Sequence, residues 1–250
     1  MYFRPDARAI DALRPITIEF GYLSNTPGSV LYRQGRTWIL ATATVELGVP
    51  RWMENKAEGW ITAEYNMIPA ATRPRKAREQ IGKQSGRSLE IQRLVGRALR
   101  AVADLSTIPN RTIYLDCEVL QADGGTRCAS INAAYLALML AVSQLMREEG
   151  LRKSPIREPV GAISVGLMQE RGILDMSHQE DSMASVDMNL VMTASGKWAE
   201  IQGTGEGAAF DDFQLQELLR LGKAGILSIL AISQAALNEQ VPNLLLPTPA

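Results

Sequence analysis

A change of hydrophobic period near the middle of the chain is the feature that most constrains the fold. From Thr112 to Leu120, apolar residues alternate with polar ones, which is the pattern of a half-buried β-strand with Cys117 in the core. The strand runs into Gly124 and Gly125, and a segment dense in small residues follows from Ala129 and predicts a helix. The chain must therefore pass from strand to helix through a tight glycine turn.

The remaining elements form blocks. Pro, Arg and Gly fill residues 69–87 without a period, which predicts a loop, and an apolar stripe from Ser88 predicts a helix capped by Ser85 or Ser88. A β-rich first third followed by βαβ-like pieces favours an α+β fold with mixed β-sheets. With no break in composition, residues 1–250 are expected to form a single domain. Further strands are expected at 16–20, 29–33, 37–45, 60–65, 160–168, 187–193 and 198–202, and a last helix at 212–237.

Composition excludes several classes of protein. With 46% hydrophobic and 21% charged residues over 250 positions, the chain is globular and not disordered. Its two cysteines stand apart and it has one histidine, so neither a disulfide framework nor a structural zinc site is indicated. The N-terminus lacks an apolar signal segment, and polar residues interrupt the apolar stretch 224–237. We expect a cytoplasmic protein with no membrane partner.

Charge is segregated along the chain although the net charge is only -1. Residues 71–100 carry nine Lys or Arg against two Glu, and residues 171–217 carry nine acids against two basic residues. Such a chain can offer one polyanion-binding face and one acidic pocket for a cation. Charge alone favours a simpler alternative, which is two solvated faces of a nearly neutral protein.

The turn from Gly124 to Arg127 is a candidate anion site. Glycines let backbone N–H groups converge, a helix N-terminus adds positive partial charge, and Arg127 supplies a planar fork that matches phosphate oxygens. The turn is not a Walker A loop, so ATP hydrolysis has no support. A tight turn with a surface arginine explains these four residues equally well.

Four other residues are considered on spacing alone. Arg87 lies near the start of the predicted helix, as Arg127 does in the next one. Asp181 and Asp187 could hold a magnesium ion or divide metal and proton-donor roles, but six residues of straight strand would part them by about 20 Å, so the chain would have to curl between them. His178 has no nucleophile motif beside it and is expected at the surface. For each of them, spacing alone favours an unrelated surface residue.

Taken together, these segments resemble the bacterial ribonuclease PH family of phosphate-dependent 3'-to-5' exoribonucleases, which trim transfer RNA precursors. The matching stretches follow one another over nearly the whole chain. They are Arg4-Pro5-Asp6 with Leu13-Arg14-Pro15, GWITAEYNMIP (59–69), GRSLEIQRLVGRALRA (86–101), LDCEVLQADGGTR (115–127), EDSMASVDMNLVMT (180–193) and EIQGTGEG (200–207).

The resemblance implies a ribonuclease PH-like fold of the ribosomal-protein βαβ type. It also implies phosphorolysis with inorganic phosphate as co-substrate, a reverse nucleotidyltransferase reaction, Mg²⁺ as cofactor and a homohexameric ring built as a trimer of dimers. By the same resemblance, Asp181 and Asp187 would bind the metal and transfer the proton, with Asp187 as the proton donor. The phosphate would be held by Arg87, Gly125, Thr126 and Arg127, and tRNA precursors would be gripped by Arg73, Arg75, Lys76 and Arg78.

The chain departs from the family pattern at four positions. Ala70 stands where an arginine is usual, Ala7 where the family has Gly, Ser185 where it has Glu, and Cys128 where Thr is common. The first change removes one cation of the expected RNA grip, and none removes a residue assigned to the chemistry.

Two other functions are considered beside that of a bacterial ribonuclease PH. One is a catalytic subunit like that of the archaeal exosome, and the other is a non-catalytic RNA-binding ring subunit. Arg127, Asp181 and Asp187 argue against the second, because a ring used only for binding needs no acid pair beside an anion loop. A polynucleotide phosphorylase is disfavoured, since the chain has no room for a second catalytic core.

Overall fold

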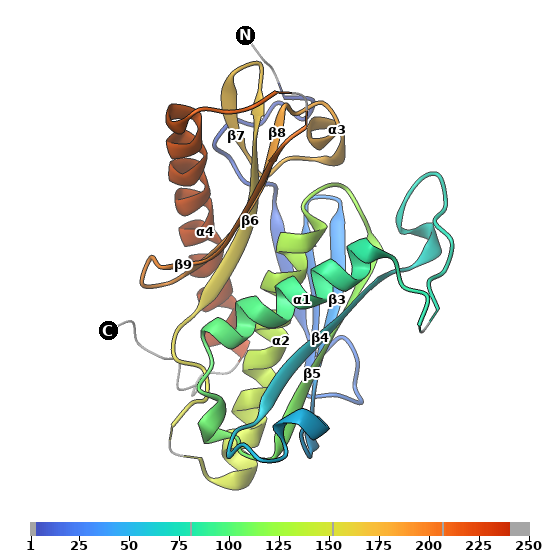
Figure 1. The fold of residues 1–250 in the computed structure, drawn as a ribbon, viewed down its shortest axis with the longest axis vertical. Helices are drawn as coiled ribbons and strands as arrows, with labels where there is room; N and C mark the ends of the chain where they lie inside the picture. The colour runs from blue at the N-terminus through green and yellow to red at the C-terminus, as the bar shows by residue number, and fades with distance from the viewer. Residues whose placement is uncertain (1–3, 81, 152, 207, 241–250) are drawn as a thin grey trace.

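The computed structural model describes residues 4–80, 82–151, 153–206 and 208–240, which form two β-sheets with helices between and outside them (Figure 1). The first sheet has the order β1-β2-β3-β5-β4, and all neighbours are antiparallel except β4 and β5. Its strands are β1 (Ile16–Phe20), β2 (Gly28–Gln34), β3 (Thr37–Leu47), β4 (Trp60–Met67) and β5 (Arg111–Gln121).

The parallel pair β4 and β5 is joined by helix α1 (Gly86–Ala101), which makes a βαβ unit as the sequence predicted. The helix begins two residues before Ser88, because the Ser85 hydroxyl accepts a hydrogen bond from the Ser88 backbone N–H at 3.2 Å and caps it. Between β4 and this helix, a short 3₁₀ turn (Pro69–Ala71) precedes the predicted loop. The shorter segments η1 (Arg51–Met53) and η3 (Leu105–Thr107) are also 3₁₀ turns.

The second sheet is antiparallel throughout and has the order β7-β6-β8-β9. Its shortest strand, together with the one-turn helix that follows, had no counterpart in the sequence prediction, because each spans only four residues and shows no period. The elements are β6 (Val160–Met168), β7 (Arg171–Leu174), α3 (His178–Asp181), β8 (Val186–Thr193), β9 (Trp198–Gly205) and α4 (Asp212–Gln240).

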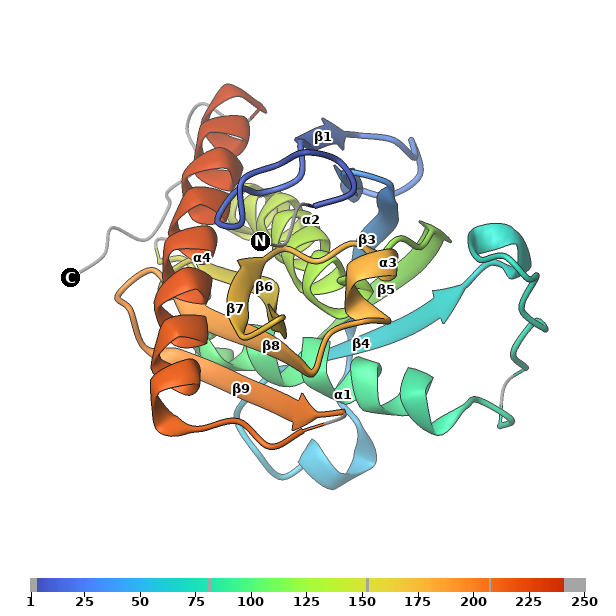
Figure 2. The ribbon, with the colours of Figure 1, turned by 90° about the horizontal axis from the view of Figure 1, so that it is seen from above.

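Helix α2 (Thr126–Glu149) lies between the two sheets. It contacts β2, β3 and β5 on one side and β6 and β8 on the other, and it is buried almost all round. Small residues such as Ala129, Ala133 and Ala134 let both sheets approach the helix closely, which explains why it begins with them. Helix α4 covers the opposite face of the second sheet (Figure 2).

The second sheet contributes to two hydrophobic cores, one on each face. One core joins the first sheet, α1 and α2 to residues of β6 and β8, and the other joins the second sheet to α4. Cys117 is buried in the first core as predicted. By length and composition α2 and α4 could cross a membrane; 89% of the most apolar window of α2 is buried, against 39% for α4, which packs on β6, β7 and β8. Packing within the fold thus explains the apolar composition of α2.

Candidate active site

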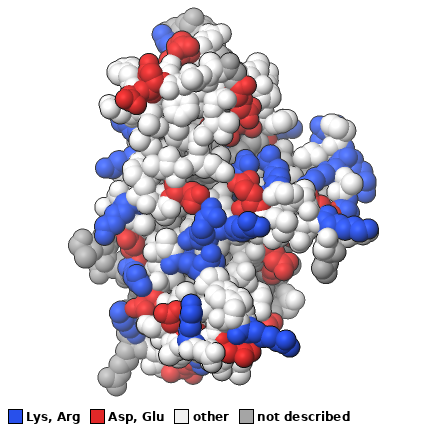
Figure 3. All heavy atoms as spheres, viewed as in Figure 1, with Lys and Arg blue, Asp and Glu red and all other residues white. Residues whose placement is uncertain are grey.

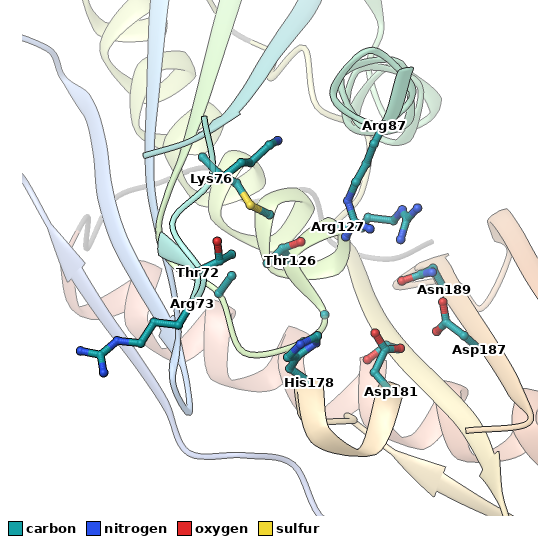
Figure 4. Close-up of a pocket in the computed structure, with 15 residues that line it drawn as sticks. Thr72, Arg73, Lys76, Arg87, Thr126, Arg127, His178, Asp181, Asp187 and Asn189 are labelled. Atoms are coloured by element: carbon teal, nitrogen blue, oxygen red, sulfur yellow. The ribbon is translucent and has the colours of Figure 1, made fainter. Parts of the chain in front are cut away.

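A cavity of about 300 Å³ lies where both sheets meet the start of α2 (Figure 4). The glycine turn and the acid pair, which are some sixty residues apart in sequence, border this same small volume. Arg75 and Arg78 lie outside its lining. The predicted site residues that line it are Arg87, Gly125, Thr126, Arg127, Asp181 and Asp187, together with Arg73 and Lys76 of the predicted RNA grip.

The turn before α2 requires glycine for two reasons. Gly124 and Gly125 have φ of +78° and +64°, which side chains disfavour. A Cβ on Gly124 would also lie 2.5 Å from the Met176 carbonyl oxygen, so this turn packs directly on the segment that leads to α3. Gly125 is the N-cap and has no side chain to cap α2, which leaves first-turn N–H groups directed toward the cavity.

A buried ion pair and a threonine hydroxyl hold the backbone of the glycine turn in place. The Arg14 guanidinium lies 2.7 Å from an Asp175 carboxylate oxygen and also donates to the carbonyl oxygen of Asp123. The Thr37 hydroxyl donates to the Gly124 carbonyl at 2.7 Å. Sequence reasoning did not identify these residues as supports, although Arg14 lies in a stretch that carried the family resemblance. Their partners are more than 80 positions away, so no local pattern indicates them.

Arg127 is oriented by a carboxylate from α1. Its Nη2 donates to Glu90 Oε2 at 3.1 Å, and Gln202 of β9 donates to the other oxygen of Glu90 at 3.0 Å. Burial raises the pKa of Glu90, but these hydrogen bonds from Gln202 and Arg127 outweigh it, so the pKa lies below its ordinary value. Arg87 reaches from the start of α1 toward Arg127 in Figure 4.

The acid pair comes together because the chain turns between α3 and β8. Ser177 and Glu180 form a capping box at the start of α3, and the buried Glu180 carboxylate accepts from Arg4 Nε at 2.7 Å. Asp181 is the last residue of this helix, and Asp187 is the second residue of β8. The turn at residues 182–185 supplies the curl that a shared site requires, since both side chains border the cavity.

Both carboxyl groups are harder to ionise than ordinary aspartates. Burial, followed by repulsion from Asp181, raises the pKa of Asp187 to about 6, although the nearby Arg127 and Arg87 act in the opposite direction. Burial also raises the pKa of Asp181, with His178 lowering it and Glu206 raising it. Near neutral pH a fraction of the Asp187 carboxyl groups keeps its proton, as a general acid requires.

The donor set at this end of the cavity suits a hard cation. Asp181 and Asp187 offer carboxylate oxygens, and Mg²⁺ is commonly held by one or two carboxylates with substrate oxygens and water completing its shell. Within the described part of the chain there is no group of three His, Cys, Asp or Glu residues that could hold a metal alone. The two carboxyl groups therefore fit a magnesium ion whose remaining ligands are not protein side chains of this group.

The cavity lining also includes residues that were not expected at the site, among them His178, Ser164 and Asn189. His178 is exposed, as predicted, but it also borders the cavity. Ser164 and Asn189 are buried, face each other across β6 and β8, and line the cavity. The only sequence signal for them is the strand period, because Asn189 lies two residues after Asp187 and so shares its face of β8.

The basic loop that precedes α1 projects from the body of the molecule (Figure 1), and basic side chains gather on it and on the neighbouring face (Figure 3). Arg73, Arg75 and Arg78 are exposed, and Lys76 forms an ion pair with Glu79 at 2.7 Å. In Figure 4 the Arg73 guanidinium points away from Arg87 and Arg127. The loop thus offers a charged surface next to the cavity.

Family models and known proteins match this chain over most of its length. Residues 12–144 match domain 1 of the 3' exoribonuclease family, and residues 158–225 match domain 2. Ribonuclease PH of Rhodopirellula baltica is 54% identical over 236 residues, which cover 92% of this chain and 96% of that protein. Ribonuclease PH of Bacillus subtilis is 48% identical over 243 residues, which cover 96% and 99%.

Solved structures show the same fold at lower identity. A chain of the Archaeoglobus fulgidus exosome with RNA bound to the active site has a TM-score of 0.78 at 22% identity and covers 91% of each chain. An archaeal exosome core chain has a TM-score of 0.75 at 20% identity and covers 93% of this chain and 91% of that one. These likenesses confirm the predicted α+β fold with mixed sheets, while the expectation of a single domain stays a prediction.

Proposed function

The chain belongs to the 3' exoribonuclease family, and we propose that it is a phosphate-dependent 3'-to-5' exoribonuclease that trims the 3' ends of tRNA precursors. The observation that carries this proposal is one cavity bordered by an anion-binding turn, two arginines and two carboxyl groups. Two phosphoryl groups have to meet in such a reaction, and positioning with charge neutralisation is the main requirement.

The step is a phosphoryl transfer. An oxygen of inorganic phosphate forms a bond to the phosphorus of the terminal phosphodiester, and the bond from that phosphorus to the 3'-oxygen of the preceding nucleotide breaks. The products are a nucleoside diphosphate and an RNA one nucleotide shorter. In the reverse direction the same site adds a nucleotide from a nucleoside diphosphate.

We assign the attacking phosphate to Arg87 and to the turn from Gly125 to Arg127. Two guanidinium groups and the N-terminus of α2 neutralise its charge and fix its direction. Asp187 gives its proton to the leaving 3'-oxygen, which its pKa of about 6 favours. Asp181 and Asp187 would also hold Mg²⁺, which when bound neutralises charge on the phosphoryl oxygens.

The basic loop would hold the RNA backbone. Arg73, Arg75, Lys76 and Arg78 can neutralise phosphates without reading the base sequence, so they would supply affinity and little specificity. Ala70 stands beside this group and offers no charge, which makes the contacts of the other four more important.

The decisive experiment supplies a tRNA with a short 3' tail and Mg²⁺, with or without inorganic phosphate. We expect nucleoside diphosphates to be released only when phosphate is present. Arg127→Ala should lose at least 100-fold in rate, on the order expected for a group that stabilises transferring charge, while still binding RNA. Arg51→Ala, an exposed arginine outside the cavity, is the control. Equal shortening without phosphate, with release of monophosphates, would show that the reaction is hydrolytic.

We further propose a homohexameric ring. Native mass spectrometry of the purified chain should give a particle of about six times 27.4 kDa that is active alone. Activity that depends on a second kind of chain would favour the arrangement of an exosome-like catalytic subunit.

A further inference from the structure

Ser164 lines the cavity and lies on β6, an inner strand of the second sheet. Ala162 and Ser164 share the face of this strand that is turned toward α2, whereas Ile163 and Val165 point into the core under α4. The Ser164 hydroxyl therefore lies close to the start of α2.

The Ser164 hydroxyl is a polar group whose partner is not part of the described protein. The residue is 3% exposed, and its Oγ has no hydrogen-bond partner among the described residues. A Cβ built on Gly125 would lie 3.3 Å from this oxygen, so the hydroxyl is next to the N-cap of α2. Buried polar atoms are nearly always satisfied, so one that borders a cavity is available to bind a ligand or an ordered water there.

A second donor without a described partner belongs to another residue that lines the same cavity. Arg127 Nε is buried and has no hydrogen-bond partner in the part of the chain that the structure describes, although Nη2 of the same group is held by Glu90. A hydroxyl, a guanidinium N–H and the first-turn N–H groups of α2 are all donors. A ligand that accepts from all of them must present several oxygens on one centre and carry negative charge.

We propose that Ser164 binds the inorganic phosphate co-substrate, with its hydroxyl donating to a phosphate oxygen held over Gly125 and Arg127. The scissile phosphodiester of the RNA offers the same chemistry, but Ser164 lies against the glycine turn, which we assign to the attacking phosphate. This inference rests on the proposed function, because it names a further ligand of the same site.

The test measures KM for phosphate and KM for RNA separately in Ser164→Ala. A hydrogen bond to a charged group predicts a KM for phosphate that rises roughly 10-fold or more, with KM for RNA unchanged. Ser130→Ala is the matched control, because Ser130 Oγ is likewise buried and without a partner among the described residues but lies outside the cavity lining. We expect the control to keep the wild-type KM for phosphate.

Ser164→Cys keeps the shape of the side chain but has a weaker hydrogen-bond donor, so its KM for phosphate should lie between those of Ser164→Ala and the wild type. This variant also keeps the inference testable if Ser164→Ala does not fold. The inference is overturned if a folded Ser164 variant keeps the wild-type KM for phosphate, if KM for RNA rises instead, or if Ser130→Ala gives the same change. A wild-type protein that does not need phosphate would overturn the proposed function itself, and this outcome is seen before any variant is made.

Discussion

Asp187 holds a carboxyl group in surroundings that oppose its ionisation. Its pKa is raised from 3.8 to about 6, so ionising this carboxyl group costs more free energy in the folded protein than in the unfolded chain, and the charge lowers the stability of the fold. This cost begins above about pH 4 and is complete above about pH 6. Catalytic groups that are kept poised in this way commonly lower stability.

Asp187→Asn should therefore raise the melting temperature. We expect a gain of a few degrees at pH 8 in the presence of a chelator, on the order of 2 kcal/mol, which shrinks as the pH is lowered toward 4. Differential scanning calorimetry across this range measures it, with Asp11→Asn at an exposed position as the control. A lower melting temperature at pH 8, or a gain that does not depend on pH, would contradict the electrostatic explanation.

At single positions, the sequence predicts only what is local. The turn from Gly124 to Arg127 is identified as a candidate anion site because its glycines, its arginine and the helix start are adjacent. Ser164 and Thr37 are not identified, because their roles depend on pairing between strands and on partners far along the chain. The convergence of Arg87 with Arg127 likewise depends on how α1 packs on α2, which spacing does not encode.

The long helices and strands can be predicted from the periodicity of apolar residues in the sequence, and the short ones cannot. Strand β5 and helices α1 and α4 lie within a few residues of their predicted bounds, because many residues contribute to each pattern. Helix α3 has four residues, and its capping box together with the contacts of Glu180 with Arg4 and Arg8 helps to hold it in place. Tertiary contacts therefore set the position of α3, and with it the position of the Asp181 carboxyl group.

Gly124→Ala tests the packing between the glycine turn and the segment before α3. We expect a loss of roughly 2–4 kcal/mol in the free energy of unfolding, because left-handed strain and a steric overlap with the Met176 carbonyl add. Gly196→Ala is the control, since Gly196 has a φ of +85° but a Cβ added there would meet no described atom within 4 Å, so only strain of about 1 kcal/mol remains. Urea unfolding compares the two, and equal losses would show that the overlap is relieved at no cost.

For the molecule as a whole, buried ion pairs join the N-terminal segment to the second sheet. Arg4 and Glu180 are 176 positions apart, and both side chains are about 1% exposed. Burial raises the pKa of Glu180, but hydrogen bonds from Arg4 and Ser177 outweigh it and the pKa is lowered. This pair therefore stabilises the fold above the ordinary glutamate pKa, and the contribution is lost as the pH falls through the lowered value.

Glu180→Gln should cost about 3–5 kcal/mol at neutral pH, because it leaves the Arg4 charge buried without its partner. Glu149→Gln breaks an ion pair with Arg111 at the surface and should cost less than about 1 kcal/mol. Chemical unfolding at pH 7 and at pH 4 measures both. The prediction fails if the two variants lose the same stability, or if the deficit of Glu180→Gln grows in acid.

The cavity has one wall from each of the two sheets, with α2 packed between them. An anion that bridges these walls acts as a removable cross-link between two cooperative units. Inorganic phosphate should therefore slow amide hydrogen exchange in β8 as well as at the start of α2, even though the two belong to different parts of the fold. Substrate supply would in this way govern how often the halves of the enzyme separate.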